Sequence, residues 1–188
     1  RLMKCRNILR KTKNIILITD FDGVWTDNNV YTNSEGIESI SCSKLDSLGL
    51  TILKNLTNEK NIKYKLIILT SELNECVKKR SNKLGTEIVQ TEKNKEKYLK
   101  SFKEEFSIQE KIPINEISLI YIGNDLNDLG AMKSADLAFC SYDSAKSITK
   151  FAYRLPAKGG KGVIRSFVEL YAKVKGWNIS YEHTFSYR

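Results

Sequence analysis

Residues 15–23 (IILITDFDG) constrain the fold of this chain more than any other stretch. A short apolar run that ends in Asp and Gly is typical of a buried strand rather than of a helix. Residues two apart on a strand point to the same side, so the carboxylates of Asp20 and Asp22 are expected to project together. Such carboxylates repel each other unless a cation lies between them or one holds a proton. The alternative is a solvated turn or helix cap, where Asp clusters are common.

Further along the chain, apolar runs alternate with amphipathic segments. Strands are predicted at residues 65–70, 87–90, 117–122 and 137–139, and a hairpin at 30–41. Helices are predicted at 45–61, 72–84, 93–106, 144–151 and 163–175, with a further helix opened by residues 123–128. This alternation predicts an α/β fold: a Rossmann-like, three-layer parallel sheet with right-handed crossovers. Ligands bind beyond the carboxyl ends of such strands, where polar residues follow the runs here.

Composition narrows the class of protein. The 188 residues suit one domain spanning 1–188, with a core at about 14–170 and a tail at 176–188; no element is predicted for residues 1–13. The net charge of +9 suits an anionic ligand, but the basic residues are too dispersed to favour nucleic acid.

No apolar run is long enough to span a membrane. Four scattered cysteines without a C-x-x-C pair argue against zinc and disulfides and predict a cytoplasmic protein. The single histidine, His183, lies in the polar tail, so a His-dependent mechanism is not expected.

Four motifs in order, each near a strand end, resemble those of the haloacid dehalogenase superfamily. The D-x-D-G-V stretch at Asp20 resembles the first motif, Thr70 the second, Lys95 the third and residues 123–128 the fourth. The resemblance implies phosphoryl transfer through an aspartyl phosphate. Asp20 would attack phosphorus, while Asp22 would protonate the leaving oxygen and then activate water.

The resemblance also implies a Mg²⁺ ion and residues that hold the phosphoryl group. The expected metal ligands are Asp20, the Asp22 backbone carbonyl, and Asn124 or Asp125. Thr70 and Lys95 would hold the phosphoryl oxygens, and Asp128 would fix Lys95 or a metal-bound water. On local evidence alone, Lys95 is more simply a solvated helix lysine. The family usually has Asp where this chain has Asn124, and the missing charge leaves full activity open.

Within the superfamily the chain most resembles a capless group. This group comprises 3-deoxy-octulosonate 8-phosphate phosphatases, nonulosonate 9-phosphate phosphatases and the related C-terminal domain of some sialic acid cytidylyltransferases. The matching positions are residues 20–27, Tyr31, Glu35-Gly36, Asp46, Leu48-Gly49, Gly159-Gly160 and residues 162–165. The resemblance implies a phosphorylated sugar-acid substrate and a homotetramer in which hairpins assemble the subunits and a neighbour roofs each active site. The expected substrate contacts are Thr70, Ser71, Glu72, Arg80, Lys83, Asp46, Lys95, Gly159 and Gly160.

The residues Glu72, Arg80 and Lys83 would select the substrate. The octulosonate enzymes typically carry Arg where this chain has Glu72, whereas the nonulosonate enzymes look similar at all three positions. The spacing predicts one face of a helix over residues 72–84, and the alternative is a solvated charge stripe.

The leading hypothesis is therefore a Mg²⁺-dependent phosphatase of a nine-carbon sugar-acid 9-phosphate, with the eight-carbon octulosonate phosphate second. An alternative is a weakly active or inactive tetramerisation domain associated with a sialic acid cytidylyltransferase. A basic nucleic-acid binder is the third and least favoured hypothesis.

Overall fold

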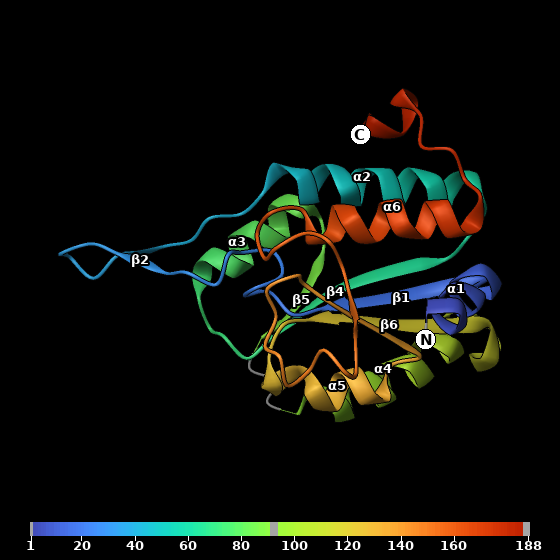
Figure 1. Cartoon of the computed structure of the whole chain (residues 1–188), viewed down its shortest axis with the longest axis horizontal. Helices are drawn as coiled ribbons and strands as arrows, with labels where there is room; N and C mark the ends of the chain where they lie inside the picture. Colours follow the sequence, from blue (N-terminus) through green and yellow to red (C-terminus); the bar gives the residue numbers. More distant parts are fainter. Residues whose placement is uncertain (1, 91–93, 186–188) are drawn as a thin grey trace.

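A six-stranded parallel sheet lies at the centre of the molecule, in the strand order β5-β4-β1-β6-β7-β8 (Figure 1). The structure is a computed structural model and describes residues 2–90 and 94–185. The strands are β1 (Asn14–Thr19), β4 (Tyr64–Thr70), β5 (Glu87–Gln90), β6 (Ile117–Gly123), β7 (Leu137–Cys140) and β8 (Tyr153–Arg154). The chain builds β4 on one side of β1 and β6 on the other, so the strand order reverses beside β1. Ligands bind at such a reversal, and the predicted α/β class is confirmed.

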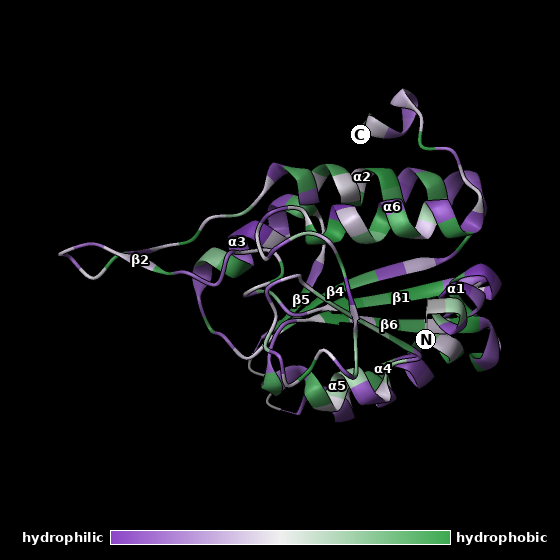
Figure 2. Cartoon of the chain, viewed as in Figure 1, coloured by the Kyte–Doolittle hydropathy of each residue, from purple (hydrophilic) through white to green (hydrophobic). Residues whose placement is uncertain are grey.

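Helices cover both faces of the sheet (Figure 1). On one face α2 (Lys44–Glu59) packs against α6 (Val163–Lys175), and on the other α4 (Lys95–Glu110) packs against α5 (Leu129–Ser134). Strand alternation divides the core accordingly: Ile15 and Leu17 belong to the first side, Ile16 and Ile18 to the second. The central strands are apolar along their length and the helices are polar on their outer surfaces (Figure 2). Strand β1 is therefore buried on both faces up to its last residue, Thr19.

A hairpin separates β1 from α2 and projects far from the body of the molecule (Figure 1). It consists of β2 (Tyr31–Thr32) and β3 (Glu38–Ser39), paired antiparallel, which confirms the predicted hairpin. Val30, Tyr31 and Ile37 are each more than half exposed on it. The hairpin and α2 alone lie between β1 and β4, so no cap domain is inserted there.

Two predicted helices need correction. Helix α3 (Glu75–Leu84) begins at Glu75, not at Glu72, and Gly85 ends it in the left-handed conformation as expected of a helix terminator. The helix starts late because the Asn74 side chain accepts a hydrogen bond from Cys76 N at 2.7 Å and so caps it. Gln90 Nε2 also donates to Glu72 O at 3.2 Å, which holds Glu72 in the preceding loop.

The helix predicted at residues 144–151 is wrong. Its residues form successive turns, in which the Ser144 hydroxyl bonds to Ser141 Oγ at 2.8 Å and Ile148 N donates to Ala145 O at 3.2 Å. The edge strand β8 follows and was not predicted. The helix predicted at residues 93–106 corresponds to α4, and its predicted start at Lys93 lies outside the described residues. Between β6 and α5 the chain forms the short 3₁₀ helix η2 (Leu126–Asp128), and η1 (Ile114–Glu116) precedes β6.

Both ends of the described chain pack against the core. The first helix, α1 (Leu2–Lys11), was not predicted. Among its described side chains Cys5 and Leu9 are buried and Ile8 is partly buried, a stripe too narrow to reveal a helix in so basic a segment. At the other end Trp177 packs against the core, and η3 (Tyr181–Thr184) lies beside α2. There His183 Nε2 bonds to Glu59 Oε2 at 2.7 Å, away from the strand ends.

Candidate active site

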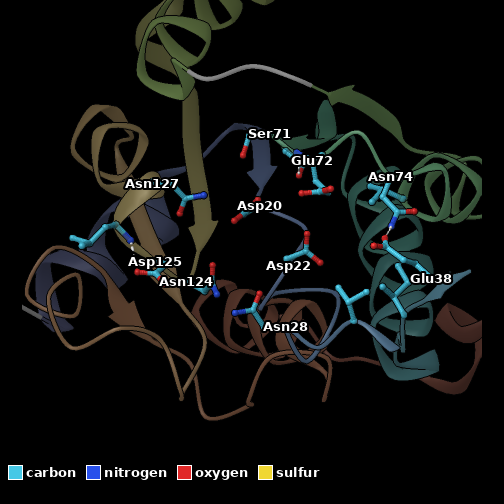
Figure 3. A pocket seen from close by; sticks show the side chains of 15 residues that line it. Asp20, Asp22, Asn28, Glu38, Ser71, Glu72, Asn74, Asn124, Asp125 and Asn127 are labelled. Atoms are coloured by element: carbon cyan, nitrogen blue, oxygen red, sulfur yellow. Dashed lines mark hydrogen bonds between the residues drawn. The ribbon is translucent and has the colours of Figure 1, made fainter. Parts of the chain in front are cut away.

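Asp20 directly follows β1 and is 5% exposed. Its oxygen Oδ1 accepts a hydrogen bond from Phe21 N at 2.8 Å and lies 2.9 Å from Lys95 Nζ. Among the described residues Oδ2 has no hydrogen-bond partner, which leaves it for a ligand. Asp20 and Asp22 line one cavity of about 540 Å³, as the sequence predicts (Figure 3).

Behind Asp20 lies a buried network centred on Lys95, the first residue of α4. Its ammonium is 2.8 Å from Asp128 Oδ1 as well as 2.9 Å from Asp20, and its side chain is 3% exposed. Burial lowers the pKa of Lys95, but the charges of Asp20 and Asp128 outweigh this effect, so its pKa is raised and it stays protonated. The buried ion pairs contradict the alternative of a solvated lysine.

Asp128 holds this network together. Besides Lys95, its Oδ1 accepts a hydrogen bond from Tyr121 OH at 2.6 Å, and its Oδ2 accepts one from Asn124 N at 2.8 Å. Asp128 is completely buried and its oxygens are committed to these donors. It therefore fixes Lys95 and the loop after β6 rather than facing the cavity.

The cavity in front of Asp20 is strongly acidic. Five acidic residues line it, and none of the described lining residues is Lys or Arg: the acids are Asp20, Asp22, Glu38, Glu72 and Asp125. Burial, followed by the negative charge of Asp128, raises the pKa of Asp20 to about 7, and Lys95 opposes this rise. Burial also raises the pKa of Asp22. The site therefore favours a cation or a proton in front of these carboxylates.

The donors around the cavity fit a hard divalent cation. Asn124 follows β6 and lies against Gly23: a Cβ at Gly23, whose φ is +71°, would come 1.9 Å from Asn124 Nδ2. This close approach brings the Asn124 amide beside the Asp20–Asp22 turn (Figure 3). Among the described residues no three His, Cys, Asp or Glu side chains form a ready-made metal cage. The available donors are oxygens of carboxylate, amide and backbone groups, which suits Mg²⁺ bound with several waters.

Thr70, Ser71 and Glu72 line the opposite wall of the cavity. Thr70 is the last residue of β4, and its Oγ1 accepts a hydrogen bond from Glu72 N at 3.1 Å. Asp125 lies on the other side, where its side chain accepts a hydrogen bond from Leu126 N at 2.7 Å. The first, second and fourth sequence motifs therefore meet at one cavity, with the third behind it.

The structure does not bring the remaining predicted substrate residues to this cavity. Arg80 Nη2 donates to Ser47 Oγ at 2.5 Å, and Lys83 lines a separate cavity beside Tyr64. Because Glu72 precedes α3, the predicted shared helix face of Glu72, Arg80 and Lys83 is wrong. Asp46 is buried against α6.

Gly159 and Gly160 pack behind the turn rather than in front of it. A Cβ at Gly159 would come 2.6 Å from Gly23 O, and one at Gly160 would come 2.6 Å from Asp27 N.

Some residues around the site were missed from the sequence. Tyr121 donates a hydrogen bond from its hydroxyl to Asp128. It lies two residues before Gly123 on β6 and so points to the same side of the sheet, which is the sequence feature that could have identified it. Thr26 donates to Asp22 Oδ1 at 3.1 Å. Asn28, Glu38, Asn74 and Asn127 line the cavity, and no local pattern distinguishes them from turn and cap residues.

No protein-family model matches the chain, but individual known proteins do. The 3-deoxy-D-manno-octulosonate 8-phosphate phosphatase of Escherichia coli K12 is 28% identical over 173 residues, which cover 90% of this chain and 86% of that protein. The crystal structure of the Moraxella catarrhalis enzyme of that name, in complex with magnesium, phosphate and KDO, superposes with a TM-score of 0.77 at 25% identity and covers 94% of each chain.

These two matches cover 90% and 94% of this chain. The chain is similar in sequence and in fold to phosphatases of the haloacid dehalogenase superfamily. It has the capless architecture of the octulosonate phosphatase structures. The N-acylneuraminate cytidylyltransferase A of Danio rerio is 24% identical over 155 residues, which cover 82% of this chain and 34% of that protein. No helix among the described residues is long and apolar enough to cross a membrane.

Proposed function

We propose that this protein is a Mg²⁺-dependent phosphatase that hydrolyses the phosphate ester of a sugar acid. The observation that carries the proposal is the convergence of Asp20 and Asp22 on one cavity, with the Lys95 ammonium buried behind Asp20. A carboxylate nucleophile, a second carboxylate and a fixed cation are the groups that two-step phosphoryl transfer needs.

In the first step a carboxylate oxygen of Asp20 attacks phosphorus and the bond from phosphorus to the sugar oxygen breaks. Asp22 donates its proton to the departing oxygen; burial raises the pKa of Asp22, which favours the protonated form that this step requires. In the second step Asp22 takes a proton from a water molecule that attacks the aspartyl phosphate. The bond from phosphorus to Asp20 breaks, which releases phosphate and restores Asp20.

In this scheme Thr70, which lines the cavity, holds a phosphoryl oxygen. The Lys95 ammonium, which Asp128 fixes beside Asp20 Oδ1, offsets the negative charge of the phosphoryl group as it joins Asp20. Asp20, the Asp22 backbone carbonyl and Asn124, with Asp125 as the alternative, would hold the metal ion. When bound, Mg²⁺ supplies positive charge that offsets the phosphate and the acidic lining.

The sugar acid's own carboxylate needs a further cation that this cavity lacks. No Lys or Arg lines it among the described residues, and acids at Glu38 and Glu72 would repel an anion. We infer that a neighbouring copy supplies the cation in a homotetramer assembled through the exposed apolar residues of the hairpin. Lys83 is the first candidate, since it lines a separate cavity of its own chain; Arg80 is the second, because its guanidinium already donates to Ser47 Oγ.

Glu72 favours the nine-carbon substrate over the eight-carbon one. It lines the cavity where the octulosonate enzymes carry an arginine, and it can accept hydrogen bonds from the hydroxyls of a longer sugar chain. The nonulosonate 9-phosphate is therefore the first substrate to test, and octulosonate 8-phosphate the second.

The test is Mg²⁺-dependent phosphate release from both substrates, from hexose 6-phosphates and from p-nitrophenyl phosphate. The proposal predicts the highest kcat/KM on a sugar-acid phosphate and loss of turnover with EDTA that Mg²⁺ restores. Equal kcat/KM on hexose 6-phosphates would contradict the substrate class, and full activity in EDTA would contradict the metal.

A second candidate function is a weakly active or inactive tetramerisation domain. Two observations favour it: the uncharged Asn124 at the metal site and the partial match to a cytidylyltransferase. It predicts tetramers with negligible phosphate release from every ester, which the same assay and light scattering would reveal.

A further inference from the structure

Asp46 is an acid that the proposed reaction does not use, and yet it is completely buried. It lies in the first turn of α2, and its Oδ1 accepts hydrogen bonds from Ile164 N at 2.7 Å and Arg165 N at 3.2 Å. These amides belong to the first turn of α6. Asp46 does not line the acidic cavity, so it is not placed to contact substrate in its own chain.

The first turn of α6 depends on this contact because it has no cap of its own. Its N-cap residue is Gly162, with φ +98° and no side chain to accept the free amides. A carboxylate from another helix takes that place, and its negative charge complements the helix N-terminus. Gly49 permits the approach: a Cβ there would come 2.8 Å from Arg165 Cα. Burial raises the pKa of Asp46 to about 6, and the amides of α6 oppose the rise.

The segment just before α6 supports the turn that carries Asp22. Gly160 N donates to Val24 O at 3.1 Å, and Gly159 packs so closely on Gly23 O that a Cβ would come 2.6 Å from it. Asp143 Oδ1 holds the same segment by accepting a hydrogen bond from Gly159 N at 3.0 Å. The 22–26 turn is thus fixed from behind by backbone contacts with residues 159–160.

We propose that Asp46 is a positioning residue for Asp22. By anchoring the first turn of α6 it fixes the Gly159-Gly160 backbone against the turn after β1, and so sets where the Asp22 carboxylate stands. This inference rests on the proposed function, in which Asp22 is the acid and base of both steps. Small displacements of such a group cost large factors in rate.

The kinetic test compares Asp46→Asn and Asp46→Ala with Glu169→Gln. Glu169 is the matched control, since it is an acid of α6 that pairs with Arg165 at 2.7 Å on the surface, away from the α6 amides. We expect kcat to fall about tenfold or more in Asp46→Asn on both the sugar-acid phosphate and p-nitrophenyl phosphate, with KM little changed. The control should keep wild-type values. A rise in KM for the sugar acid alone would overturn the proposal and make Asp46 a substrate contact.

A second measurement does not depend on activity. Hydrogen–deuterium exchange of the Asp46 variants should speed up at residues 159–165 and also at 21–27, while residues 95–110 stay protected. Faster exchange at 159–165 without any change at 21–27 would overturn the coupling. If the wild-type protein hydrolysed no ester, the proposed function would fail while this exchange result would still decide the coupling. If Asp46→Ala does not fold, both measurements are made on Asp46→Asn, which keeps the side-chain volume.

Discussion

The buried side and the open rim of the candidate active site differ in how far the charges of one chain are paired. On the buried side, Asp20, Lys95 and Asp128 pair with one another, and Tyr121 completes the hydrogen bonding. On the rim, Glu38 and Glu72 face the cavity without a basic residue beside them in the described lining. Under the proposed function, the side that handles the phosphate is complete within one chain, whereas the side that selects the substrate takes positive charge from a second copy.

Apart from loss of the nucleophile itself, the largest expected effect is on the buried side. Lys95→Met leaves Asp20 and Asp128 without their shared cation, and removing one partner of a buried ion pair costs about 3–5 kcal/mol. We expect kcat to fall at least about a hundredfold and urea unfolding to shift to lower concentration. Lys97→Ala, an exposed lysine of the same helix, is the control and should change neither quantity. Wild-type stability in Lys95→Met would show that the pair does not form in solution.

The buried side was also the easier one to predict from sequence. Asp20 and Asp22 follow an apolar strand whose neighbours in the sheet end at the same edge, so periodicity and strand order suffice to bring them together. Lys95 required the family resemblance, because locally it is one lysine among several on a polar helix. Tyr121 was missed, since a buried hydroxyl has no signature beyond its strand position.

The rim was predicted poorly for a physical reason. Helical spacing joined Glu72 to Arg80, but the Asn74 cap starts the helix three residues later. Arg80 hydrogen-bonds to α2 instead, a tertiary contact that spacing does not reveal. The resemblance marked Asp46 and Gly159 as substrate contacts, but Asp46 bonds to the first turn of α6 and Gly159 packs against Gly23.

The next largest expected effect comes from a variant that tests whether a neighbouring subunit supplies a cation to the rim. Lys83→Ala should raise KM for the nine-carbon substrate about tenfold or more and leave KM for p-nitrophenyl phosphate unchanged, because a charge-assisted contact to the substrate carboxylate is lost. Mixing this variant with Asp20→Asn subunits under exchange conditions should restore low-KM turnover, since sites with an intact Asp20 then receive an intact Lys83. Lys79→Ala on the same helix is the control. A mixture no better than its parts would contradict sharing between subunits.

Removing the hairpin tests whether it holds the proposed tetramer together. Replacement of residues 29–39 by a short glycine-serine linker should convert tetramers to smaller species in light scattering and lower kcat/KM on the sugar acid more than on p-nitrophenyl phosphate. We expect this because the exposed apolar residues of the hairpin would form the contacts between subunits. A fully active monomer would show that the rim needs no neighbour.

The smallest expected effect lies where rim and buried side meet, at the metal. Asn124→Asp replaces a neutral amide with a charged ligand, so the Mg²⁺ concentration for half-maximal activity should fall about tenfold. Asn127→Asp adds the same charge to the same cavity and controls for a general electrostatic effect. An equal fall in both variants would mean that Asn124 is not a ligand.

Acid-quenched peptide mass spectrometry detects directly whether Asp20 carries the phosphoryl group. With wild-type protein, Mg²⁺ and substrate, we expect one phosphoryl adduct on the peptide that contains Asp20. The adduct should accumulate in Asp22→Asn and be absent in Asp20→Asn, whose turnover should fall at least about a thousandfold while Glu104→Gln remains normal. Steady hydrolysis by a folded Asp20→Asn protein, or an adduct on another residue, would contradict the assignment of Asp20 as the nucleophile.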